Sequence, residues 1–169
     1  MQKQIAVLSQ KEKNITLSLK KYFENKNVDV YTTASPLEAM DSDLCIVDEF
    51  YGHISNNILE ESIFIKLHNS LLPAFDCENP IEKAFKAGVK VSGITICYLN
   101  PDGTNGKIIA QYPSFIEINT TTQDFETELF RIKEKLTPFV AESILNDKIF
   151  DFSELLKNNN CSGSCGNCH

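Results

Sequence analysis

The sequence HNSLLPAF occupies residues 68–75 and carries the clearest structural signal in the chain. A short apolar run precedes it, so we expect a strand that delivers His68 into a loop ended by Pro73. A second block follows, with IEKAFKAGVKVSGIT at residues 81–95 and GKIIAQ at residues 106–111. These blocks predict a helix and two further strands after the histidine.

The rest of the chain continues this alternation of strands and helices. We expect strands at residues 4–9, 28–32, 44–47, 64–67, 91–99 and 107–115, and helices at residues 13–25, 35–40, 80–87 and 122–147. The unbroken apolar run at residues 44–47 is typical of a strand covered on both faces. Pro138 is expected to kink the last helix or to divide it in two. The pattern predicts an α/β fold with a mainly parallel twisted sheet and flanking helices.

Length and charge restrict the class of protein. The 169 residues fit one domain, predicted at residues 1–157, with a separate flexible tail at residues 158–169. The net charge is −7 and no basic cluster interleaves with aromatic residues, so nucleic acid is an improbable partner. No apolar run approaches the ~20 residues of a membrane span, and the first apolar stretch is too short for a secretory signal. We therefore expect a cytoplasmic protein; its oligomeric state is not determined by the sequence.

The tail holds a second chemical signal. Cys161, Cys165, Cys168 and His169 place four soft donors within nine residues, separated by small residues. Such a set can wrap a Zn²⁺ ion or hold part of an iron–sulfur cluster. The alternative is a cysteine-bearing tail that binds metal only adventitiously.

The blocks around His68 resemble the folate-dependent formyltransferases, and most closely the phosphoribosylglycinamide formyltransferases of purine synthesis. The order, spacing and turn residues agree over roughly residues 43–145. The resemblance implies a Rossmann-like formyltransferase fold. It also implies transfer of a formyl group from 10-formyltetrahydrofolate to an amine.

The family's catalytic set is altered in this chain. The family's Asn-x-His pattern falls on residues 66–68, so His68 is kept and Lys66 replaces the asparagine. The family's aspartate falls on Thr104, with Asp102 two residues earlier. The resemblance therefore makes Lys66, His68, Asp102 and Thr104 the candidate catalytic residues. Loss of one oxyanion donor costs ~10²–10³ in rate, so we expect the family's activity to be weakened or lost.

The family's ligand loops are altered as well. Its glycine-rich phosphate loop after the first strand matches SQKEKN at residues 9–14, where both glycines are missing and Glu12 adds negative charge. A family Met-Arg pair beside the folate matches Tyr51 and Gly52. The interval before His68 is shorter than in the family, which indicates a deleted strand–helix segment.

Three functional interpretations follow. The first is a shortened, divergent formyltransferase with weak or absent classical activity. The second is a non-catalytic metal-binding or regulatory protein that uses the fold as a platform. The third is a transferase that acts on another small amine through His68, which could otherwise be a structural histidine bonded to nearby backbone.

Overall fold

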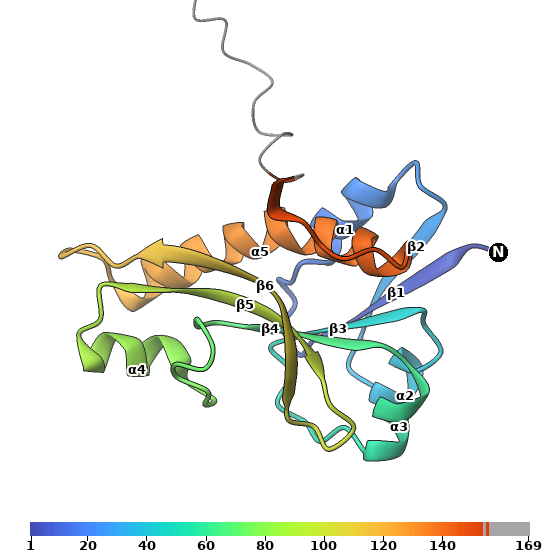
Figure 1. Cartoon of the computed structure of the whole chain (residues 1–169), viewed down its shortest axis with the longest axis horizontal. Coiled ribbons are helices and arrows are strands. Elements are labelled where there is room, and N and C mark those ends of the chain that lie inside the picture. The colour runs from blue at the N-terminus through green and yellow to red at the C-terminus, as the bar shows by residue number, and fades with distance from the viewer. Residues whose placement is uncertain (154, 156–169) are drawn as a thin grey trace, which may run out of the picture.

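The computed structural model describes residues 1–153 and residue 155, and their core is one mixed sheet (Figure 1). Within these residues the strands are β1 (Lys3–Leu8), β2 (Val28–Thr33), β3 (Leu44–Asp48), β4 (Phe64–His68), β5 (Val91–Leu99) and β6 (Asn105–Phe115). Their order in the sheet is β2-β1-β3-β4-β5-β6. The predicted tail, residues 158–169, lies outside the described residues, and with it the predicted metal ligands.

The strands β1 to β4 pair with one another in parallel, whereas β5 is antiparallel to β4 and forms an antiparallel hairpin with β6 at one edge. The prediction of an α/β fold with a mainly parallel sheet is confirmed, since β1 to β4 form the parallel part of the sheet. Parallel strands end at the same edge of a sheet, so the loops that follow β1, β3 and β4 meet there.

Helices cover both faces of the sheet (Figure 1). They are α1 (Thr16–Phe23), α2 (Pro36–Ala39), α3 (Asn56–Glu61), α4 (Pro80–Ala87) and α5 (Thr122–Leu145). Apolar side chains of α1 and α5 pack on one face of β1, β3 and β4, whereas α2 and α3 pack on the other face. Alternate residues of β1 and β3 enter these two cores, as the period of a strand requires.

The ends of the helices follow from local sequence. Gly88 ends α4 with a positive φ of 69°, a conformation that glycine adopts without a Cβ penalty. Thr121 and Asp124 form a reciprocal capping box at the start of α5. The helix then continues through Pro138 to Leu145, so of the two effects expected of the proline the division of the helix is wrong, whereas the kink stays a prediction. Both Pro138 and the preceding Thr137 are buried, and packing on the sheet holds the helix together across the lost hydrogen bond.

None of the described helices is long and apolar enough to cross a membrane.

Candidate active site

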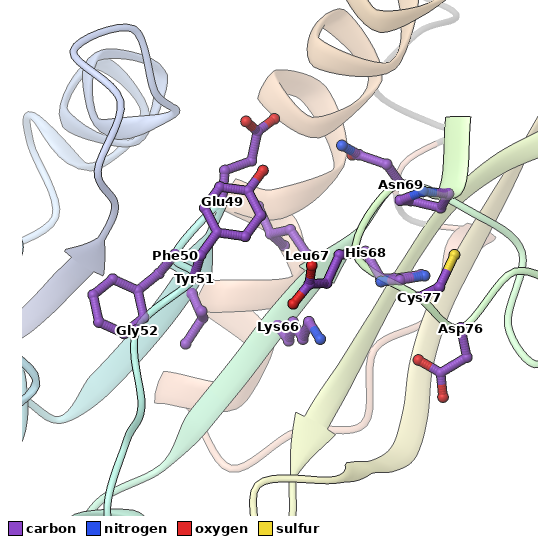
Figure 2. A pocket seen from close by; sticks show the side chains of 13 residues that line it. Glu49, Phe50, Tyr51, Gly52, Lys66, Leu67, His68, Asn69, Asp76 and Cys77 are labelled. Atoms are coloured by element: carbon purple, nitrogen blue, oxygen red, sulfur yellow. The ribbon is translucent and has the colours of Figure 1, made fainter. Parts of the chain in front are cut away.

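A pocket of about 350 Å³ opens at the carboxyl ends of β3 and β4 (Figure 2). The end of β4 contributes Lys66 and His68, which alternate with Leu67 along the strand. The loop after β3 contributes Glu49 and Tyr51. This position, at the edge where parallel strands end, is where ligands bind in open α/β sheets.

His68 is held in place by the loop that follows it. Its Nε2 lies 3.1 Å from the carbonyl oxygen of Phe75, which can only accept, so Nε2 carries the proton and Nδ1 is left as an acceptor. The residue is 5% exposed. Burial lowers the pKa of His68, although the Phe75 bond and the Asp76 charge oppose that shift. His68 is therefore a neutral imidazole near pH 7, able to take up a proton at Nδ1.

Lys66 and Asp76 are two charged pocket residues that act on this histidine, and the Lys133 charge acts on it as well. Lys66 is half-buried in the pocket wall, and its charge disfavours protonation of His68. Asp76 also lines the pocket and favours that protonation. Asn105 Nδ2 donates to Asp76 Oδ1 at 2.7 Å, which anchors the carboxylate to the β6 edge. The pocket thus combines a base, an ammonium group and three carboxylates, those of Glu49, Asp76 and Glu78.

Asp102 and Thr104 are not brought to this pocket. They lie in the turn between β5 and β6, where the Thr104 backbone and hydroxyl both donate to Asp102 Oδ1, at 2.9 Å and 2.6 Å. The hydroxyl bond, followed by the backbone bond, lowers the pKa of Asp102. Neither residue is among those that line the pocket. Their contacts are those of a stable turn, and Asp76 is the carboxylate beside His68.

A buried ion pair lies under the pocket. Lys133 of α5 is 2% exposed and donates to Asp48 Oδ1 at 2.8 Å, and its Nζ lies 3.5 Å from Glu49 Oε1. These residues join α5 to the end of β3. Burial opposes ionisation of Glu49, but the hydrogen bond from Lys11 and the charges of Lys133 and Lys11 outweigh it and lower the pKa of Glu49.

Lys11, in the loop after β1, is paired with two carboxylates, one of which is that of Glu49. Its ammonium contacts Glu49 and lies 3.1 Å from Glu126 Oε1 of α5. Burial works against the charged form, yet the bonds to the two carboxylates prevail and raise the pKa of Lys11. The Lys11 ammonium, which could otherwise bind an anionic ligand, is therefore already neutralised by these carboxylates.

The backbone of this loop is also occupied. The Lys11 amide donates to Ser9 Oγ at 3.2 Å, and the Thr16 amide donates to Asn14 Oδ1 at 3.0 Å. A phosphate site at a helix start needs such amides free and a close approach of bare backbone. The sequence prediction that this loop departs from a phosphate-binding loop agrees with these contacts.

Some residues of the site are not visible as such in the sequence. Asp76 directly follows Phe75, the last residue of the HNSLLPAF stretch. Its position in the loop after His68 was the one sequence feature that could have indicated it as a pocket residue. Lys133 and Asp48 are 85 positions apart, and nothing in the sequence pairs them. Within the described residues no group of three or more His, Cys, Asp or Glu side chains could hold a metal ion.

The fold and the pocket define an α/β protein with an open pocket at the carboxyl edge of its sheet. Residues 1–140 match the model of the formyl transferase family, and the chain belongs to that family. The resemblance inferred from the blocks around His68 is thereby confirmed.

Sequence relatives carry several formyl-group activities. The phosphoribosylglycinamide formyltransferase of Bacillus subtilis (strain 168) is 31% identical over 127 residues, which are 74% of this chain and 65% of that protein. The methionyl-tRNA formyltransferase of Campylobacter fetus subsp. fetus (strain 82-40) is 28% identical over 148 residues, 87% of this chain and 46% of that protein. The chain thus spans less than two thirds of the length of these relatives.

Solved structures show the same fold. The phosphoribosylglycinamide formyltransferase of Anaplasma phagocytophilum superposes with a TM-score of 0.73 at 20% identity, over 87% of this chain and 89% of that one. A 4-N formyltransferase from Francisella tularensis gives a TM-score of 0.71 at 18% identity, over 87% and 71% of the two chains. At these identities the likeness establishes the fold alone.

Proposed function

We propose that this protein is a divergent formyltransferase that keeps a reactive pocket around His68, while classical transfer to glycinamide ribonucleotide is weakened or lost. The formyl donor is 10-formyltetrahydrofolate, and the reaction belongs to cytoplasmic one-carbon metabolism related to purine synthesis. The observation that carries the proposal is the buried, neutral His68 beside Lys66 and Asp76 in an open pocket.

The chemistry assigns a role to each of these three groups. A new C–N bond forms between the acceptor amine and the formyl carbon, the bond from that carbon to the donor nitrogen breaks, and one proton passes from acceptor to donor. His68 takes that proton at Nδ1, the position that the Phe75 bond leaves free. The Lys66 ammonium replaces the family's asparagine as the donor to the oxyanion, and Asp76 stabilises the imidazolium.

The contacts of the loop after β1 support the proposal that transfer to glycinamide ribonucleotide is weakened or lost. Lys11 is bound by two carboxylates, and the Lys11 and Thr16 amides have internal partners. The phosphate of glycinamide ribonucleotide would displace these contacts and meet Glu12 and Glu49. The pocket of about 350 Å³ lies at the small end of the ~300–1,000 Å³ typical of ligand sites.

Turnover of 10-formyltetrahydrofolate by the purified chain, in the presence of a panel of small amines, tests the proposal. We expect slow formylation of at least one amine, reduced ~10²–10⁴-fold by His68→Ala. The matched control is His53→Ala, which removes the exposed histidine of the loop after β3 and should keep full activity. Absence of turnover with every amine, or equal loss in both variants, would overturn the proposal and favour the non-catalytic platform.

The spacing of the tail ligands supports a second function, metal binding. Cys161, Cys165, Cys168 and His169 provide the four soft donors that Zn²⁺ prefers. Elemental analysis of protein purified without oxygen should find bound Zn or Fe, and the Cys161/Cys165/Cys168→Ser variant should lose it. Equal metal content in both proteins would refute this function.

A further inference from the structure

Two side chains of the β5–β6 hairpin hold the loop that follows His68. Thr95 of β5 lies directly opposite His68 in the antiparallel pair of β4 and β5, and Gln111 of β6 lies opposite Thr95. The side chains of directly opposite residues lie on one face of a sheet, so all three share the same face. We name Thr95 and Gln111 the hairpin anchor.

Every polar hydrogen of the hairpin anchor is used to hold the loop. The Thr95 hydroxyl is buried; it donates to the Ser70 carbonyl oxygen at 2.7 Å and accepts from the Leu72 amide at 2.9 Å. Gln111 Nε2 donates to Thr95 Oγ1 at 3.0 Å and to the Leu72 carbonyl oxygen at 2.8 Å. A hydroxyl has one donor and two acceptor positions, and a side-chain amide nitrogen has two N–H groups, so none of these remains free.

The loop carries this restraint from the hairpin anchor to the imidazole. Ser70 Oγ donates to the Ala74 carbonyl oxygen at 2.6 Å, and the Ala74 amide donates to the Leu71 carbonyl oxygen at 3.0 Å. Phe75 then has a φ of 55°, a conformation that a residue with a Cβ keeps only where its surroundings impose it. Its carbonyl oxygen is the acceptor for His68 Nε2 at 3.1 Å. The orientation of the imidazole therefore depends on a loop that the hairpin anchor holds.

We propose that Gln111, acting through Thr95 and the loop, is a positioning residue that fixes the His68 imidazole for proton transfer. This inference rests on the proposed formyl transfer, in which Nδ1 takes the proton. While the loop is held, the Phe75 carbonyl oxygen keeps the proton on Nε2 and leaves Nδ1 as the acceptor. Without the hairpin anchor the imidazole loses its fixed partner, and the base is no longer aligned with the acceptor amine.

The Nε2 proton of His68 provides a test that needs no formyl donor. An imidazole proton exchanges rapidly with water unless it is buried and hydrogen-bonded. Nitrogen-15 NMR of the whole chain near neutral pH should therefore show a resonance that His68→Ala removes. Gln111→Met and Thr95→Val should lose it, because neither replacement can donate to the loop. Thr95→Ser, which keeps the hydroxyl, should retain it.

The rate of formyl transfer distinguishes positioning from stability. Each variant is assayed at a temperature at which circular dichroism shows it to be folded. The kcat of Gln111→Met should then be about 10²-fold lower with little change in KM, because a misplaced base affects the transition state more than binding. Thr95→Ser should keep most of the rate. The matched control is Lys107→Met, an exposed position of the same strand, which should keep both the resonance and the rate.

The proposal is overturned if the unaltered protein lacks the resonance, if Gln111→Met keeps it or keeps its kcat, or if Lys107→Met loses it as well. Should Thr95→Val not fold, Gln111→Met decides alone, since Gln111 is only half-buried on the edge strand. Loss of the resonance in Gln111→Met, with no turnover by any of the proteins, would refute formyl transfer while upholding the role of Gln111 in holding His68. The two proposals therefore fail separately.

Discussion

Replacement of Lys133 by methionine removes the buried cation that joins α5 to the end of β3. The Lys133 side chain is 2% exposed, and its partner Asp48 has a side chain 4% exposed at 2.8 Å. Methionine fills nearly the same volume, so no large cavity forms, and the main effect is an uncompensated buried carboxylate. Loss of one partner of a buried pair costs about 3–5 kcal/mol, a large part of the ~5–15 kcal/mol of a typical domain.

Urea unfolding, followed by circular dichroism, measures this loss. With an m-value of about 2 kcal/mol/M, the midpoint should fall by about 1.5–2.5 M. The exposed Lys135→Met on the same helix is the control and should change stability by less than about 0.5 kcal/mol. The double variant Lys133→Met/Asp48→Asn should recover part of the loss, since both charges are then gone. Equal midpoints for Lys133→Met and Lys135→Met would refute the buried pair.

Three further predictions concern the pocket and the sheet. Lys66→Met should lower formyl transfer by ~10²–10³ without changing the urea midpoint, if Lys66 donates to the oxyanion; unchanged rates would refute that role. Burial lowers the pKa of His68 in the native chain below its value in the unfolded chain. As the pH falls below about 6.5, the unfolded chain therefore binds a proton at His68 more readily than the native chain, and the free energy of unfolding should decrease. Between pH 7.5 and pH 5.5 the urea midpoint should decline less for His68→Gln than for the unaltered protein. Identical pH dependence of the two proteins would contradict the lowered pKa of His68. Gly93→Ala places a Cβ 2.1 Å from the Tyr112 carbonyl oxygen and should cost at least about 3 kcal/mol. Gly103→Ala, where no atom lies within 4 Å but φ is +80°, should cost only about 1–2 kcal/mol in thermal unfolding, and equal costs would contradict this reasoning.

Much of the fold was predictable from local sequence. Strand and helix periodicity located every strand to within two residues at each end, and Pro80 and Gly88 bounded α4 correctly. The prediction omitted α3, because Asn56–Glu61 is a six-residue helix with no apolar repeat long enough to identify it. The continuity of α5 through Pro138 was not predictable, because the packing of α5 on the sheet is not visible in local sequence.

Only those residues of the candidate site that are close together in the sequence were predictable as neighbours. Residues 66–68 lie on one strand, and so the pattern itself placed Lys66 and His68 together. Asp102 and Thr104 were chosen by their position relative to the block at residues 106–111, but the β5–β6 turn carries them away from the pocket. Asp76 lines the pocket instead, and Asn105 donates a hydrogen bond to its carboxylate. Contacts of this kind between distant segments depend on tertiary packing.

The rate of formyl transfer to glycinamide ribonucleotide, measured beside the Bacillus subtilis relative under the same conditions, tests the central claim most directly. We propose that Lys66 stands in the place of the family's oxyanion donor, and Lys11 is bound by carboxylates, so kcat/KM should be at least ~10²-fold lower for this chain. A kcat/KM equal to that of the relative would contradict the account.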